Sequence, residues 1–290
     1  MLVSLPGKDR MDGIERLDST PLAPAIGAEV RGIDLREPLD ERRFRDIERL
    51  WLERCVLLFR GQDLSVEHQV AFAGRFGPLG RRANVTPGAT EHPAVMLVSN
   101  IREDGKPIGA LPDGEMFFHS DQCYVERPCK ATMLYAIEVP SIGGNTIFAN
   151  TIRAYETLPE ELKRRIGELR ALNVYDYEGS ATRRSDRVAA DAPRFVHPVV
   201  RTHPETGRRA LYVNRLMTQR IEGLDRAESG ALLARLFEHQ ERAEFRYEHR
   251  WRSGDLILWD NRSTVHARTD FSAGERRLLR RVILLGDRPV

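Results

Sequence analysis

A histidine and an aspartate, separated by one residue, are central to the stretch that runs from Met116 to Thr146. Side chains at positions i and i+2 of an extended segment point to the same face. His119 and Asp121 can therefore direct an imidazole nitrogen and a carboxylate oxygen at a common point. A polar pair within an apolar wall is typical of a small-molecule or metal site. The alternative is a surface loop, because such triplets also arise by chance.

A second segment supplies a third candidate ligand. Leu256 to Trp259 reads as a buried strand, and His266 follows shortly after it. Two histidines and one carboxylate form the facial triad that holds non-haem Fe(II) and leaves coordination positions open. Those positions admit a 2-oxoacid that chelates through two atoms, and then O2. The sequence thus indicates an iron site on His119, Asp121 and His266.

Two arginine pairs come after His266, at positions 276/277 and 280/281. A 2-oxoacid with a distal carboxylate needs a cation some distance beyond the metal. Arginine suits this task because its planar fork grips a carboxylate with two hydrogen bonds. Residues four apart on a strand share a face, so we expect Arg277 and Arg281 to point the same way.

These motifs, in this order, resemble the TauD/TfdA family of Fe(II)- and 2-oxoglutarate-dependent dioxygenases. The resemblance rests on the His-x-Asp motif, the Gly-Gly-Asn-Thr segment ending at Thr146, the Trp-Asp-Asn-Arg-x-x-x-His segment ending at His266, and the arginine at 277. It extends roughly from residue 27 to 286. It implies that His119, Asp121 and His266 bind iron, that Thr146 and Arg277 bind the distal carboxylate of 2-oxoglutarate, and that Arg281 meets an anionic group of the substrate.

The aspartate at position 121 bears on the type of reaction. Family-like halogenases replace this carboxylate with a small residue that admits chloride, so hydroxylation is favoured here. Asp260 also precedes His266 closely, but the resemblance gives it a structural role. The sequence leaves open whether the outcome is hydroxylation or another oxidation such as desaturation.

The substrate is less constrained. Arg281 indicates an anionic group, although bracing 2-oxoglutarate or the fold is an equal alternative. Taurine-specific members surround their substrate with a His, a Tyr and an Asn, and the corresponding positions fall near Ala83, Thr86 and Glu115, which do not match. Glu115 would instead suit a cationic or hydroxylated part of the substrate. An apolar wall is expected from Phe118, Tyr124 and Met217.

The leading interpretation is hydroxylation of a C–H bond of a small anionic substrate, with release of succinate and CO2. An amino acid or a carboxylic acid, as in natural-product tailoring, is the favoured substrate. The alternative is catabolic cleavage of a sulfonate, a sulfate ester or an aryloxyalkanoate. A zinc hydrolase on the same ligands would leave Arg277 without a role. A jelly-roll binding module without activity is disfavoured because the iron and 2-oxoglutarate residues are all present.

Composition narrows the class of protein. The 290 residues are 41% hydrophobic and 30% charged, which is globular, and the net charge of +2 implies no strong attraction to nucleic acid or to a membrane surface. No apolar run has the length of a membrane helix, and the first residues lack the apolar core of a signal peptide. The odd set of three cysteines, with Cys123 and Cys129 near the His-x-Asp motif, favours reduced thiols and a cytoplasmic location. A homo-oligomer, either a dimer or a tetramer, is compatible with the sequence.

Many short strand patterns alternate with turns, and helical patterns cluster early and in insertions. They predict a mainly β, single-domain fold, an antiparallel double-sheet jelly roll with helical decoration. The resemblance implies the double-stranded β-helix. We expect a flexible tail at 1–20, a domain at 21–290, and loops at 101–114 and 175–193 whose role as lids stays open. Helices are expected at 40–53, 65–76 and 152–172 and after the Asp225/Glu228 capping motif, and further strands include 56–59, 95–98, 131–139, 211–214 and 278–285.

Overall fold

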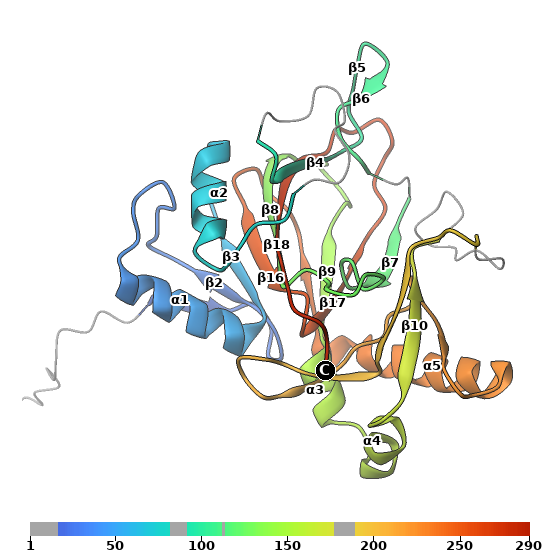
Figure 1. Cartoon of the computed structure of the whole chain (residues 1–290). Helices are drawn as coiled ribbons and strands as arrows, with labels where there is room; N and C mark the ends of the chain where they lie inside the picture. The colour runs from blue at the N-terminus through green and yellow to red at the C-terminus, as the bar shows by residue number, and fades with distance from the viewer. Residues whose placement is uncertain (1–16, 82–91, 112–113, 177–188) are drawn as a thin grey trace, which may run out of the picture.

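Two β-sheets form the centre of the molecule (Figure 1). The computed structural model describes residues 17–81, 92–111, 114–176 and 189–290. The larger sheet takes its strands in the order β1 (Ser19–Pro21), β2 (Ala28–Val30), β3 (Val56–Phe59), β16 (Leu256–Asp260), β8 (Ala131–Glu138), β18 (Leu278–Leu284) and β4 (Val95–Ser99). The smaller sheet takes β15 (Arg246–His249), β9 (Thr146–Asn150), β17 (Thr264–Arg268) and β7 (Met116–His119). Neighbouring strands are antiparallel apart from the parallel pair β2 and β3.

The two sheets pack against each other through apolar side chains on their facing surfaces. Phe148 of β9 and Trp259 of β16 have ring centroids 5.4 Å apart. Leu134 of β8 and Leu279 of β18 belong to the same buried cluster as these two rings. The alternation of side chains along each strand places these residues between the sheets and their neighbours on the outer faces.

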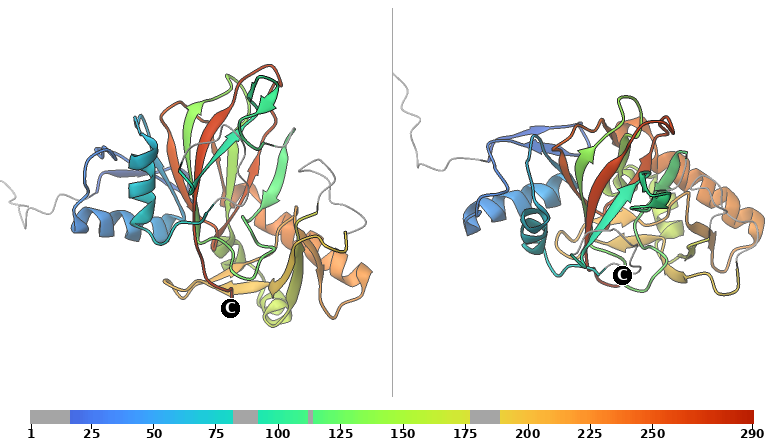
Figure 2. Two further views of the ribbon diagram at one scale, coloured as in Figure 1. Left: turned by 45° about the horizontal axis from the view of Figure 1, so that its top comes forward. Right: turned by 90° about the horizontal axis from the view of Figure 1, so that it is seen from above.

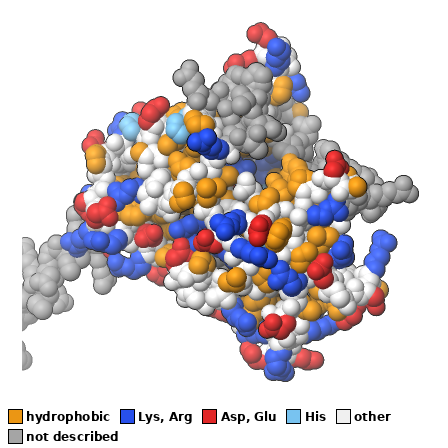
Figure 3. Space-filling model, viewed as in Figure 1, with side chains coloured by type: hydrophobic (Ala, Val, Ile, Leu, Met, Phe, Trp, Pro, Cys, Tyr) orange, Lys and Arg blue, Asp and Glu red, His pale blue; other side chains and the backbone are white. Residues whose placement is uncertain are grey.

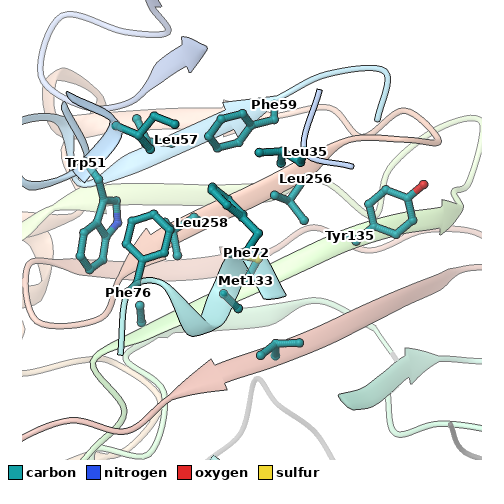
Figure 4. Close-up of a cluster of buried hydrophobic side chains, with 14 of the residues drawn as sticks. Leu35, Trp51, Leu57, Phe59, Phe72, Phe76, Met133, Tyr135, Leu256 and Leu258 are labelled. Atoms are coloured by element: carbon teal, nitrogen blue, oxygen red, sulfur yellow. The ribbon is translucent and has the colours of Figure 1, made fainter. Parts of the chain in front are cut away.

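Two helices cover the outer face of the larger sheet. Helix α1 (Glu41–Arg54) begins after the N-cap Asp40, which accepts a hydrogen bond from the backbone N–H of Arg43, and α2 (Val66–Gly74) begins after the N-cap Ser65. Aromatic side chains of these helices and of the turn after α2 are buried against β3, β8 and β16, as Figure 4 shows for Trp51 of α1, Phe72 of α2 and Phe76 just beyond α2. Burying one such side chain stabilises the fold by roughly 1.5–3 kcal/mol.

A second group of elements lies on the opposite flank from α1 and α2 (Figure 2). It comprises α3 (Thr151–Glu156), α4 (Glu160–Ile166), α5 (Arg226–Gln240), the sheet β11 (Arg194–Pro198), β10 (Arg170–Val174) and β14 (Thr218–Ile221), and the hairpin β12 (Val200–Thr202) and β13 (Arg209–Leu211). These elements share their own buried cluster, which includes Leu236 and Phe237 of α5. The remaining short elements are β5 (Arg102–Glu103), β6 (Lys106–Pro107) and the 3-10 helix η1 (Ala243–Phe245).

Several expected elements differ from the structure. The single helix predicted at 152–172 is wrong: α3 ends at Glu156 and α4 restarts after Pro159, which serves as its N-cap, while Leu172 lies in β10. Proline lacks the N–H that a continuous helix needs. The strand predicted at 211–214 ends at Leu211, and the predicted loop at 101–114 contains the β5–β6 hairpin.

Ser19 and Thr20, predicted to belong to a flexible tail, instead pair with β2, while residues 1–16 lie outside the described residues, as do 177–188 of the predicted loop at 175–193. Basic and acidic side chains are interspersed over the described residues of the face in Figure 3. In the described parts of the chain, every helix is too short or too polar to cross a bilayer.

Candidate active site

Strands β7 and β17 bring together the two histidines of the site. His119 and His266 are direct partners in the register of these antiparallel strands, and their ring centroids lie 4.1 Å apart. His266 therefore lies within strand β17. The sequence predicted only that it follows the strand at 256–259. Asp121 follows the end of β7, and its Oδ1 is 3.9 Å from Nε2 of His119 and 4.0 Å from Nε2 of His266.

These three side chains form a compact donor set for a metal ion. One ligand atom from each lies within 4.8 Å of the others, and all three residues are buried. Two donors bound to one ion at about 2.1 Å can be at most about 4.2 Å apart, so the nitrogen–oxygen separations fit a shared ion. The set of two imidazoles and one carboxylate fits Fe(II) with open positions.

Hydrogen bonding and burial prepare the ligands for a metal. His119 Nδ1 lies 2.9 Å from the carbonyl oxygen of Phe117, which only accepts, so Nδ1 carries the proton and Nε2 presents its lone pair. Burial lowers the pKa of both His119 and His266 and favours the neutral, metal-binding imidazole. Burial opposes ionisation of Asp121, but the Arg281 guanidinium and the histidines hold the pKa of its carboxyl below its ordinary value.

A cavity of about 510 Å³ lies between the facing strands and contains this cluster at its wall. That volume is within the usual range for a small-molecule site. Thr146, Arg277 and Arg281 also line it, as the sequence analysis expected of groups that bind 2-oxoglutarate and substrate. Arg277, directly before β18, and Arg281, within β18, thus face the same cavity as expected, whereas their neighbour Arg276 is exposed and pairs with Glu138.

Arg277 has the features of an anion-binding residue. Its side chain is 2% exposed, and its Nε and Nη1 atoms have no hydrogen-bond partner among the described residues. Burial, and then the nearby Arg268, lower the pKa of Arg277 to about 9. A buried cation without a counter-ion is costly, which indicates that an anion completes this end of the cavity.

A glycine turn makes room for this arginine. Gly144 has φ +64°, a conformation that L side chains rarely adopt. A Cβ there would lie 3.1 Å from Pro140 Cγ and 3.4 Å from Nε of Arg277. Gly144, the second glycine of the pair before Thr146, is therefore favoured over a larger residue for steric reasons.

Thr146 also lines the cavity. Its Oγ1 accepts a hydrogen bond of 3.0 Å from the indole N–H of Trp251. Since the indole nitrogen only donates, the hydroxyl proton of Thr146 is available to a different acceptor, such as a carboxylate in the cavity.

Four residues were predicted to contact substrate besides Arg281. Tyr124 and Met217 line the cavity. Phe118 packs outside it, in a cluster with Ala149, Val265 and Ala267, and Glu115 is exposed. Phe118 adjoins His119 on a strand, so it must face away from the cavity.

Further residues line the cavity that the sequence motifs did not indicate. Arg268 lines the cavity, and the i+2 rule applied to His266 would have found it. Met96 and Ile108 add apolar wall from the chain before β7, where no motif marked them.

Comparisons with known proteins place the chain among related sequences and structures. A family model described as "Taurine catabolism dioxygenase TauD, TfdA family" matches residues 18–283. An alpha-ketoglutarate-dependent 2,4-dichlorophenoxyacetate dioxygenase of Cupriavidus pinatubonensis (strain JMP 134) is 38% identical over 284 residues, covering 93% of this chain and 98% of the relative. A pentalenolactone F synthase of Streptomyces avermitilis is 35% identical over 283 residues, covering 91% and 92%. The solved structure of AAD-2 in complex with Mn(II) and N-oxalylglycine has a TM-score of 0.78 at 30% identity, covering 94% of this chain and 98% of that one.

Proposed function

The chain belongs to the TauD/TfdA family of 2-oxoglutarate-dependent dioxygenases, and from that premise we propose that it hydroxylates a small anionic substrate beside His119, Asp121 and His266. It is an oxidoreductase that uses Fe(II) and 2-oxoglutarate. When bound, Fe(II), 2-oxoglutarate and O2 supply the oxidising chemistry, in which 2-oxoglutarate becomes succinate and CO2 while the substrate gains oxygen.

The observation that carries this proposal is the presence of two features in one cavity. The donor set of His119, Asp121 and His266 stands at one point, and the buried guanidinium of Arg277 stands at another without a protein counter-ion among the described residues. A zinc hydrolase needs the first feature but not the second. A binding module without a metal needs neither.

The residues have distinct roles in this proposal. His119, Asp121 and His266 hold Fe(II). Arg277 pairs with the distal carboxylate of 2-oxoglutarate, and Thr146 donates its free hydroxyl proton to the same group. Arg281 binds the anionic group of the substrate within reach of Asp121, which its Nη2 contacts at 2.9 Å.

The cavity lining favours one class of substrate. Asp121 is the one acidic residue among its described lining residues, so an ammonium group would lack a free carboxylate partner. Apolar side chains, among them Met96, Ile108 and Met217, would instead surround an apolar body. We therefore favour a carboxylic acid over an amino acid. An aryloxyalkanoate, sulfonate or sulfate ester presents a similar anionic head and apolar body and is the second candidate.

Two further expectations belong with this proposal. The two facing sheets, with the site between them, support the double-stranded β-helix form of the jelly roll. The three cysteines are free and buried, which supports a reducing, cytoplasmic environment.

Two measurements test the function. Anaerobic addition of Fe(II) and 2-oxoglutarate should produce a weak visible charge-transfer band, and its absence would favour the binding module. A panel of carboxylic acids, amino acids, sulfonates and sulfate esters should then be screened for substrate-dependent succinate release. Release with amino acids alone would overturn our preference for an apolar carboxylic acid.

A further inference from the structure

Asp121 is the ligand that no strand ladder holds. It lies in the turn after β7, and the next residue, Gln122, has φ +58°, in the left-handed region. His119 and His266, by contrast, are fixed by direct pairing of their strands. The orientation of the Asp121 carboxylate therefore depends on side-chain contacts.

One of those contacts comes from the opposite sheet. Thr132 of β8 is fully buried, and its hydroxyl donates to Asp121 Oδ2 over 2.6 Å. The guanidinium of Arg281 contacts the other oxygen, Oδ1, and so does not compete for Oδ2. Oδ1 is also the oxygen that lies 3.9 and 4.0 Å from the two histidine Nε2 atoms.

The direction of the Thr132 proton is set by two further buried groups. The indole N–H of Trp259 donates to Asn261 Oδ1 over 2.9 Å, which orients the amide because an indole nitrogen cannot accept. Asn261 Nδ2 then donates to Thr132 Oγ1 over 2.9 Å. Since Thr132 receives this amide proton, its own proton is directed at Asp121.

From this chain of hydrogen bonds we propose that Thr132 is a positioning residue for the metal, one that holds Asp121 so that Oδ1 alone faces the ion. The inference rests on the metal site of the proposed function and adds a role for strand β8 of the larger sheet, which supplies no metal ligand of its own. Loss of the hydroxyl leaves a buried carboxylate oxygen without its donor. Partners of this kind commonly change metal affinity by 10- to 100-fold.

The test compares Mn(II) binding to the full chain by titration calorimetry in wild type, Thr132→Ser and Thr132→Ala. Serine and alanine differ by the hydroxyl alone. We expect alanine to raise the dissociation constant about 10- to 100-fold and serine to stay within about 3-fold of wild type. Wild-type affinity in the alanine variant, or an equal loss in both variants, would overturn the proposal.

Further variants keep the outcome decisive. Thr132→Val preserves the branched shape and replaces alanine if metal-free unfolding curves show that the alanine variant is not folded. Asn261→Leu leaves Thr132 in place but removes the amide that directs its proton. An unchanged Mn(II) dissociation constant in this variant refutes the assigned direction of the hydrogen bonds.

His119→Ala distinguishes failure of the proposed metal site from failure of the positioning role. If wild type and His119→Ala bind Mn(II) equally, the metal site itself is wrong, whereas loss in His119→Ala with no effect at Thr132 refutes the positioning role alone.

Discussion

The guanidinium of Arg281 contacts the carboxylate of Asp121, with Nη2 2.9 Å from Oδ1. The Arg281 side chain thus contacts one of the three proposed metal ligands and also lines the cavity. A substrate anion bound at Arg281 would be held close to the iron site, which gives the substrate a fixed position relative to the centre that oxidises it.

Replacing Arg281 with glutamine should weaken substrate binding more than cofactor binding. Truncating one partner of a buried charge pair typically costs about 2 kcal/mol or more, which corresponds to a rise of about 30-fold or more in the KM for substrate. Steady-state kinetics with substrate and 2-oxoglutarate varied separately provide the measurement. If the KM for 2-oxoglutarate alone rises, Arg281 braces the cofactor and not the substrate.

Arg277→Leu should raise the KM for 2-oxoglutarate by about 30-fold or more, because the distal carboxylate loses its buried cation. Its neighbour gives a matched control. Arg276 directly precedes Arg277, is largely exposed and pairs with Glu138, so Arg276→Leu should leave the KM for 2-oxoglutarate unchanged. A folded Arg277→Leu enzyme with the wild-type KM for 2-oxoglutarate contradicts the assignment.

Asp121→Ala should abolish both Mn(II) binding and substrate-dependent succinate release, since two neutral imidazoles alone hold the ion weakly. Calorimetry and succinate release provide independent measurements. Glu115→Gln is the control, because Glu115 is exposed and should affect neither. Retained turnover in Asp121→Ala would refute the ligand assignment.

Trp251→Phe should raise the KM for 2-oxoglutarate by a smaller factor, about 3- to 10-fold, because the Thr146 hydroxyl loses a buried donor worth about 1 kcal/mol. Thr146→Val should have an effect at least as large. Since Trp251 is argued to act through Thr146, the double variant should be no worse than Thr146→Val. Fully additive losses would show that Trp251 acts by another route.

His197 should make the stability of the fold depend on pH. Burial lowers its pKa from 6.5 to about 4, and it lies 2.9 Å from the carbonyl oxygen of Val125. The unfolded chain binds a proton more readily, so this contribution is complete above about pH 6.5 and is lost as pH falls towards 4. His197→Gln should flatten the slope of unfolding free energy between these values, measured by denaturant titration.

The sequence predicted the site better than its surroundings. The two-residue spacing of His119 and Asp121 predicted that both face one point, and the structure places them together although Asp121 lies in the turn after β7. The four-residue spacing of Arg277 and Arg281 predicted that both face the same way, and both line the cavity. The contact of Thr132 with Asp121 depends instead on how two sheets pack, and no local pattern marks it.

The wrong predictions have physical reasons too. Phe118 was assigned to the substrate wall by its proximity to His119, although adjacent residues of a strand face opposite sides. The long helix at 152–172 rested on apolar periodicity, and the break before Pro159 overrode it.

The four-residue separation of Arg277, directly before β18, and Arg281, within β18, sets the spacing between the two anion sites that we propose. Arg277 and Arg281 begin about 13 Å apart, at roughly 3.3 Å per residue. Deleting one residue between them would turn one guanidinium towards the helical layer, so the separation can change only by two residues at a time. New substrate specificities in this scaffold are therefore expected to arise through changes in the walls of the cavity. The distance between the proposed cofactor-binding residue Arg277 and the proposed substrate-binding residue Arg281 stays constant.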